Sequence, residues 1–147
     1  MWIAFIERLV LALIAADVAC SESGSDYRDG ACVLSVVRNR AVSKWRRYDG
    51  TLWTAITSPH QHAHGCRAPM TLGHLRLGYQ FAAGSLEAAP FCASALNYIG
   101  DHDDPDLSCD DYGLSPVGEI AHTYCGPPRS IALSSGGRDN GHNVLRR

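Results

Sequence analysis

The chain has 147 residues, of which 46% are apolar, and its 13 basic and 15 acidic residues give a formal charge of −2. This length and composition fit one compact domain, and the near balance of charge excludes attraction of the whole chain to nucleic acid or to an anionic membrane. We therefore expect a partner to be recognised at a local site.

An amphipathic helix is predicted at the start of the chain. Glu22 falls on its apolar face, directly before a break at Gly24 that suits a helix C-terminus, and Asp26 and Asp29 follow in the loop behind it. Partial burial raises the pKa of a carboxyl group and lets it keep its proton near neutral pH, as the acid that cleaves a glycosidic bond must do. The apolar stripe that leads to this glutamate consists of Leu11, Ile14, Ala15, Val18 and Ala19.

The first 20 residues are apolar enough to resemble a targeting segment. Glu7 and Arg8 interrupt them, however, and the uncharged stretch that follows covers only residues 9–16, whereas a membrane span needs about 20 residues. A lipoprotein cleavage site would require an aliphatic residue where Asp17 stands, three places before Cys20. The sequence therefore predicts a helix that belongs to the fold, with no convincing signal peptide and no stable membrane span.

A second helix is predicted over residues 30–45, with Arg38 and Arg40 on its polar flank. Its β-branched residues leave a strand as the alternative. The inward face of the predicted helix consists of Val33, Val36 and Val37.

Residues 48–66 are predicted to be irregular. Asp49-Gly50 signals a turn, and Pro59 ends the short apolar run that precedes it. A loop of this length usually marks function.

A third helix is predicted over residues 72–86, and Gly84 weakens its end. It is followed by an acidic loop over residues 101–113 and by a last strand over residues 119–126. The predicted inward stripe of this helix is Leu75, Tyr79, Ala82, Ala83 and Leu86.

The composition changes after the prolines at 127 and 128. From Arg129 the chain is rich in Ser, Gly, Asn and Arg and has few apolar residues. We therefore predict a folded domain over residues 1–128 and a flexible basic tail over residues 129–147 that binds wall polymer or a partner protein.

Six cysteines in a chain this short favour an oxidising destination. Their spacing allows fifteen pairings, so the sequence leaves disulfides and buried free thiols open. No CxxC motif occurs, which argues against a zinc ribbon or a thioredoxin-like redox pair.

Three histidines and a cysteine alternate in the segment HQHAHGC. In an extended conformation His60, His62 and His64 would share one face with Cys66 next in line, which is a ligand set for a transition metal. A polar, hydrogen-bonding loop is the alternative, and it is the one that we favour. In the acidic loop, Pro105 breaks the EF-hand pattern. We therefore expect neither a metal ion nor another cofactor.

The segment ADVACSESGSDYRDGACVLSVVRNRAV resembles the opening of the cell-wall hydrolases of the spore cortex-lytic enzyme (SleB) type. That family begins with a helix that ends in an Ala-x-Glu-like step, a loop with a second acid, a glycine, and a helix that closes on Val-Val-x-Asn-Arg. Glu22, Asp26, Gly30 and residues 36–40 stand in those places. The chain departs from the pattern in having Asp26 in place of a glutamate and one residue fewer between Gly30 and Asn39.

Weaker matches follow along the chain. Gln61 resembles the glutamine after the family's proline-containing loop, and the segments QFAAGSL, SALNYIG and EIAHTYC resemble its alanine-rich helix and two of its strands. A histidine-rich stretch replaces the usual glutamine-phenylalanine context. Together the matches cover residues 16–124.

The resemblance implies a helix-rich, lysozyme-like α+β single domain with a small β element. It also implies cleavage of the MurNAc-GlcNAc β-1,4 bond of peptidoglycan by a muramidase or lytic transglycosylase. Glu22 would be the general acid and then the base, while Asp26 would either position the substrate or stabilise developing positive charge. The other groove residues would be Gln61, Tyr98, His122 and Tyr124.

The resemblance places the activity in the periplasm or cell wall. A phage or other particle could also carry such a lysin, with residues 129–147 docking on a tail-assembly protein. For Asn39 and Arg40 we expect a structural role as a hydrogen-bonding pair at the helix end. The alternative function is a non-catalytic module of a larger assembly, stapled by cysteines or bound to metal through the loop histidines.

Overall fold

Two long helices open the chain and meet at a tight turn. The computed structural model describes residues 2–43, 50–58 and 62–128. Helix α1 (Trp2–Ser23) ends at Gly24, whose φ of 55° lies in the left-handed region that favours glycine. Helix α2 (Tyr27–Ser43) begins directly afterwards. The helical prediction for both segments is confirmed.

The aspartate before α2 acts as its N-cap. Asp26 Oδ1 accepts a hydrogen bond from the backbone N–H of Asp29 at 3.0 Å, which satisfies one of the free donors of the first turn. Asp26 is exposed, whereas Asp29 is fully buried. The first turn of α2 therefore carries two carboxylates with different surroundings.

Two shorter helices cover the first pair. Helix α3 (Leu52–Thr57) is capped by Thr51 and occupies part of the segment predicted to be irregular. Helix α4 (Leu72–Ala83) starts with a capping box between Thr71 and His74 and ends at Gly84 in the left-handed conformation.

The predicted inward face of α4 is wrong. Leu75 and Tyr79 are 38% and 64% exposed. The buried face lies one step round the helix, where Gly78 allows close packing on α1. It consists of His74, Leu77, Gly78 and Phe81.

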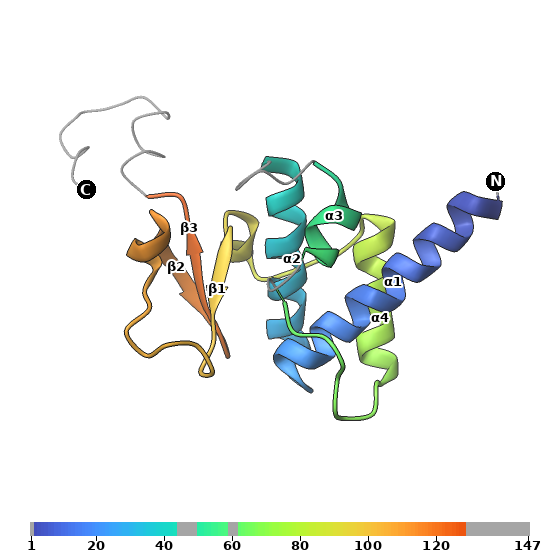
Figure 1. Ribbon diagram of the computed structural model, residues 1–147, viewed down its shortest axis with the longest axis horizontal. Helices are drawn as coiled ribbons and strands as arrows, with labels where there is room; N and C mark the ends of the chain where they lie inside the picture. Colours follow the sequence, from blue (N-terminus) through green and yellow to red (C-terminus); the bar gives the residue numbers. More distant parts are fainter. Residues whose placement is uncertain (1, 44–49, 59–61, 129–147) are drawn as a thin grey trace.

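Helices α1 and α4 cross at closest approach beside Gly78. A Cβ atom at Gly78 would lie 2.0 Å from the carbonyl oxygen of Ala12 and 2.9 Å from the backbone nitrogen of Ala16. Only a residue without a side chain fits at this crossing, which brings the two backbones into contact (Figure 1).

A small antiparallel sheet lies beside the helices, next to α2 (Figure 1). Strands β1 (Asn97–Ile99), β2 (Ser115–Glu119) and β3 (Thr123–Gly126) are ordered β1-β3-β2. In the register of β1 on β3, Tyr98 lies opposite Tyr124. The last predicted strand is therefore the end of β2, a turn and β3. The domain is a helix-rich α+β fold, as predicted.

The second helix supplies much of the core. Its predicted inward valines at 33, 36 and 37 are fully buried. Arg40 is 2% exposed, so its predicted place on the polar flank is wrong. Its Nε donates to the carbonyl oxygen of Leu96 at 2.8 Å, and Asn39 Nδ2 donates to the carbonyl oxygens of Cys92 and Ala95. The predicted structural role of Asn39 and Arg40 is confirmed, because both tie α2 to the segment that enters the sheet.

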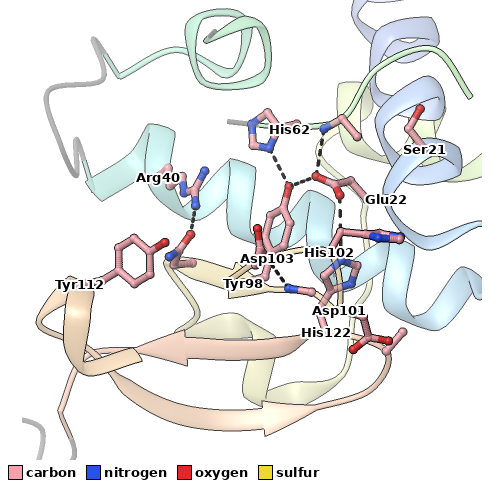
Figure 2. A pocket seen from close by; sticks show the side chains of 14 residues that line it. Ser21, Glu22, Arg40, His62, Tyr98, Asp101, His102, Asp103, Tyr112 and His122 are labelled. Carbon is pink, nitrogen blue, oxygen red and sulfur yellow. Dashed lines mark hydrogen bonds and ion pairs between the residues drawn. The ribbon is translucent and has the colours of Figure 1, made fainter. Parts of the chain in front are cut away.

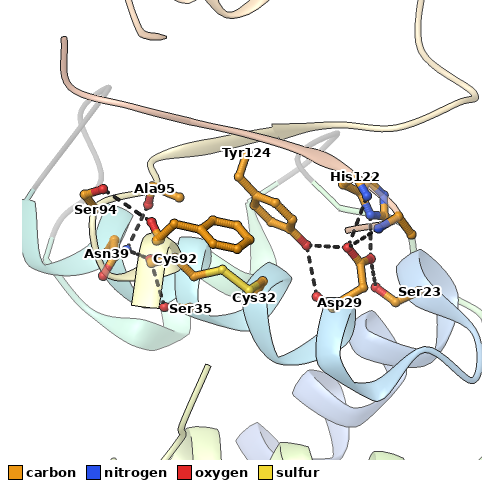
Figure 3. The surroundings of a disulfide bond; sticks show 12 residues. Ser23, Asp29, Cys32, Ser35, Asn39, Cys92, Ser94, Ala95, His122 and Tyr124 are labelled. Atoms are coloured by element: carbon orange, nitrogen blue, oxygen red, sulfur yellow. Dashed lines mark hydrogen bonds and ion pairs between the residues drawn. A yellow bond between two sulfur atoms is a disulfide. The ribbon is translucent and has the colours of Figure 1, made fainter. Parts of the chain in front are cut away.

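All six cysteines are paired. The disulfide Cys32–Cys92 joins α2 to the short 3₁₀ helix η2 (Pro90–Ala93), and Figure 3 shows it beside the residues that anchor that segment. Cys109–Cys125 closes the sheet on the acidic loop, and Cys20–Cys66 ties the loop after α3 to the end of α1. The disulfide alternative is the one that the fold adopts.

The N-terminal half of α1 extends beyond the other helices (Figure 1). Its apolar side chains are exposed, so the prediction that this helix belongs to the fold holds for its second half, where residues 15–20 are mostly buried. Within the described residues, α1 and the other helices all fall short of the length and apolarity that crossing a membrane requires. The exposed side chains are Trp2, Ile3, Phe5, Ile6, Leu9, Val10 and Leu13.

Candidate functional site

A pocket of about 650 Å³ opens where the end of α1, the loop after α3 and the sheet meet (Figure 2). Glu22 enters it from α1, His62 from the loop and Tyr98 from β1. His122 comes from the turn between β2 and β3, and Asp101 and Asp103 belong to the exposed acidic loop. Segments that are distant in the sequence thus supply the polar groups of one site.

Glu22 is the carboxylate at the centre of these contacts. Its Oε2 lies 2.5 Å from Tyr98 Oη and accepts a hydrogen bond from the backbone N–H of Ala63 at 3.0 Å. Its Oε1 lies 4.0 Å from His122 Nε2, and its side chain is 16% exposed. The carboxyl group is therefore held in a fixed position while it remains accessible from the pocket.

The loop that supplies the Ala63 N–H is fastened at several points. The disulfide between Cys66 and Cys20 joins it to α1 two residues before Glu22. Asp17, one turn earlier, accepts hydrogen bonds from the backbone N–H groups of Gly65 and Cys66. Helix α1 thus positions both the carboxylate and the loop that faces it.

A second carboxylate lies behind the pocket and is fully buried. Asp29 Oδ2 is 2.6 Å from His122 Nδ1 and accepts a hydrogen bond from the Ser23 hydroxyl at 2.6 Å (Figure 3). Asp29 Oδ1 accepts from the Tyr124 hydroxyl at 2.8 Å and from the backbone N–H groups of Ala121 and His122. Asp29 therefore fixes the turn that carries His122 and orients the imidazole towards Glu22.

The contacts of Asp29 and His122 determine the charge that each of these two side chains carries. Burial alone would raise the pKa of Asp29, but the hydrogen bonds from His122, Ser23 and Tyr124 outweigh it and hold that pKa well below its usual value. Burial also opposes protonation of His122, yet the hydrogen bond to Asp29 and the nearby charges of Asp29, Glu22 and Asp103 raise the pKa of the imidazole. His122 is thus a cation beside Glu22 at mildly acidic pH.

The second histidine of the pocket has the opposite character. His62 is 9% exposed, with Nδ1 2.9 Å from Tyr98 Oη and Nε2 3.0 Å from the carbonyl oxygen of Ala55. Burial, together with the charges of Arg40 and His64, lowers its pKa to about 4, although the hydrogen bond to Ala55 acts in the opposite direction. His62 is therefore a neutral imidazole at neutral pH.

These two histidines predict a maximum of stability near pH 6.5. A raised pKa at His122 contributes stability below the unfolded value of about 6.5 and loses it as pH rises through the folded value. A lowered pKa at His62 costs stability as pH falls from about 6.5 to about 4, by roughly 3 kcal/mol. Urea denaturation between pH 4 and pH 8 should therefore show the free energy of unfolding decreasing on both sides.

The variant His62→Gln separates the two contributions. Glutamine does not titrate, so the decrease on the acid side should become shallower while the decrease above pH 6.5 remains. If the free energy of unfolding of the variant decreased below pH 6.5 as steeply as that of the wild type, the assignment to His62 would be contradicted.

Two predicted substrate residues line the pocket and two do not. Tyr98 and His122 lie in it beside Glu22. Asp26 is outside it and caps α2, and Tyr124 is fully buried beneath it, bonded to Asp29. Gln61 and His60 are outside the described residues.

The metal-binding alternative is not supported by the geometry of this loop. Cys66 is bonded to Cys20, both ring nitrogens of His62 lie within hydrogen-bond distance of protein atoms, and His64 pairs with Asp17 at 3.4 Å. In the described part of the chain, no group of three histidine, cysteine or acidic side chains is arranged to hold a metal ion.

The sequence did not single out Asp29 as the buried partner or His62 as a contact of Tyr98. Asp29 was predicted in the loop before a helix that begins at residue 30, whereas it lies in the first turn of α2, two positions after Tyr27. No local signal relates His62 to Tyr98, because the two are 36 residues apart.

Comparisons with protein-family models, with curated proteins and with solved structures found no match to this chain.

Proposed function

We propose that the protein cleaves the glycan strand of peptidoglycan at the MurNAc-GlcNAc β-1,4 bond, with Glu22 as the general acid and then the base. The observation that carries the proposal is the position of Glu22. It follows the buried second half of α1, points into a pocket of about 650 Å³ and is held by Tyr98 and the Ala63 N–H beside a cationic His122.

In the first step the Glu22 carboxyl group gives its proton to the glycosidic oxygen as the bond to the anomeric carbon breaks. The glutamate is then ionised. His122 Nε2 stabilises this anion from 4.0 Å, and the Tyr98 hydroxyl and Ala63 N–H donate to it. Asp29 supports the charge of His122 from behind.

In the second step Glu22 takes a proton from the hydroxyl that attacks the anomeric carbon. In a transglycosylase this is the 6-hydroxyl of the same muramic acid, so an anhydro ring forms and no water is consumed. A nucleophilic second carboxylate is then unnecessary. This agrees with a site in which Asp29, the carboxylate nearest in the network, is fully buried and out of reach of a sugar.

The resemblance to the SleB-type hydrolases supports the same assignment. The glutamate that the resemblance identifies as the acid lies in the pocket, together with Tyr98 and His122. Three disulfides fit an oxidising site of action, such as the periplasm or cell wall. A lysozyme-like arrangement remains part of this proposal.

Digestion of purified peptidoglycan followed by mass spectrometry tests the function. We expect soluble fragments whose muramic ends are lighter by one water than reducing ends. Reducing ends would identify hydrolysis by a muramidase instead. A digest without glycan fragments, at a protein concentration where a known lysozyme gives complete lysis, would refute cleavage of this bond.

One observation favours a second candidate, a non-catalytic module of a larger assembly such as a phage particle. The N-terminal half of α1 exposes seven large apolar side chains, a surface that soluble monomers rarely present. A carried lysin would show both assembly and cleavage, whereas a purely structural module would be inactive in a zymogram.

A further inference from the structure

A continuous chain of hydrogen bonds leads from the proposed acid into the protein. Glu22 Oε2 lies 2.5 Å from Tyr98 Oη, which lies 2.9 Å from His62 Nδ1, and His62 Nε2 lies 3.0 Å from the carbonyl oxygen of Ala55 (Figure 2 shows the first two contacts). The chain joins α1, β1 and the loop after α3 and ends at α3. The catalytic proposal uses its first contact alone.

The last contact of this hydrogen-bond chain, with the carbonyl oxygen of Ala55, fixes the tautomer of His62. A carbonyl oxygen only accepts hydrogen bonds, so the contact with Ala55 requires a proton on His62 Nε2. The ring is 9% exposed and feels the charge of Arg40, with a pKa of about 4, so it carries one proton at neutral pH. Nδ1 is then an acceptor that faces the Tyr98 hydroxyl.

The hydroxyl in the middle has a single proton for these two neighbours. If Tyr98 donates to His62, its contact with Glu22 requires a proton on the carboxyl group. If Tyr98 donates to an ionised Glu22, its oxygen and His62 Nδ1 face each other with lone pairs, and one buried acceptor is left unsatisfied. The direction of the Tyr98 hydroxyl is therefore linked to the protonation of Glu22.

We infer that His62 and Tyr98 are positioning residues that favour the protonated form of Glu22 before cleavage and turn a donor towards it afterwards. The inference rests on the proposed function. When Glu22 gives its proton to the glycosidic oxygen, the Tyr98 O–H rotates from His62 to the carboxylate. When Glu22 recovers a proton from the attacking hydroxyl, the O–H returns. Neither Tyr98 nor His62 gains or loses a proton.

Other charged groups surround this chain of hydrogen bonds, and the variants that test it retain them. The Arg40 guanidinium lies 5.8 Å from the centre of the Tyr98 ring, and His122 faces Glu22 from the turn after β2. The groups whose charges act on the residues of the hydrogen-bond chain are Arg40 from α2, His64 from the loop after α3, Asp103 from the acidic loop, and His122 with Asp29 behind it.

The pH dependence of kcat/KM on a soluble glycan tests the catalytic role. His62→Phe keeps the ring volume but removes the acceptor, so Tyr98 then donates to Glu22 alone and favours its ionised form. We expect the alkaline limb to move to lower pH by about one pH unit, the effect of one hydrogen bond. His62→Gln, which can accept from Tyr98 and donate to Ala55, should bring the alkaline limb most of the way back to its wild-type position.

Two controls make the result specific. In a Tyr98→Phe background, His62→Phe should cause no further shift, because the hydrogen-bond chain is already broken. Tyr79→Phe, which changes an exposed ring outside the pocket, should leave the alkaline limb in place. If a folded His62→Phe protein had its alkaline limb at the same pH as the wild type, the inference would be overturned.

An independent readout needs no activity. The ¹⁵N spectrum of the His62 ring should show the neutral form with the proton on Nε2 between pH 5 and pH 8. A proton on Nδ1, or a protonated ring in this range, would overturn the hydrogen-bond chain even if the protein is a lysin. A wild type that gives the expected spectrum but no glycan fragments would instead overturn the proposed function, and the catalytic role of the chain with it.

Discussion

Replacement of Glu22 by glutamine should lower the rate of glycan cleavage by about 10²- to 10⁴-fold, because the amide keeps the shape of the side chain but cannot donate the proton. The amide oxygen can still accept from the Ala63 N–H and the Tyr98 hydroxyl, so the melting temperature should change little. The rate of release of soluble fragments from purified peptidoglycan measures the effect.

The matched control is Glu87→Gln, the same change at an exposed residue outside the pocket. It should leave both the rate and the melting temperature unchanged. A Glu22→Gln protein that retains more than a tenth of the wild-type rate would require another acid, and the carboxylates at the mouth of the pocket, Asp101 and Asp103, would be the next to test.

Replacement of Asp29 by asparagine should destabilise the fold by about 3–5 kcal/mol, the usual cost of removing one partner of a buried ion pair. Asp29 is fully buried and accepts from His122, Ser23 and Tyr124, so the two hydrogens of the asparagine amide would oppose donors already in place. We expect the melting temperature to fall by roughly 10 °C.

The natural control for this variant is Asp26→Asn, three residues earlier. Asp26 is exposed and caps α2, and asparagine caps a helix as well as aspartate does, so the stability should hardly change. The same control tests the role that the sequence suggested for Asp26 in substrate binding. An unchanged KM would agree with its position outside the pocket, and a raised KM would restore that role.

The helices were predictable because their signals are local. The apolar spacing of α1 identified both its buried face and the place of Glu22 at its end, and Gly24 ends this helix as predicted. Helix α4 ends at Ala83, before the predicted end at residue 86. The face of α4 was not predictable in the same way. Its sequence contains two helical stripes, and the one with Gly78, which permits the close approach to α1, is buried, whereas the one with Leu75 and Tyr79 is exposed.

The site was predictable only in part, because most of its contacts join distant segments. Glu22, Tyr98 and His122 were identified from the sequence and lie together. The pairing of Asp29 with His122 spans 93 residues, and the cysteines gave no preference among fifteen pairings. Such contacts depend on how the helices pack on the sheet, which the spacing of residues along the chain does not express.

The crossing of α1 and α4 also affects how the protein tolerates change. Any side chain at residue 78 would meet the backbone of α1 near Ala12 and Ala16 and push that helix away from α4. Glu22 follows Ala16 by less than two turns of the same helix, so the displacement would also move the carboxylate that we propose as the acid. A mutational scan would then show that residue 78 tolerates no replacement although it lies outside the pocket, whereas the exposed Tyr79 beside it accepts many. The sequences that keep the site intact would therefore be limited partly by a residue that never touches the substrate.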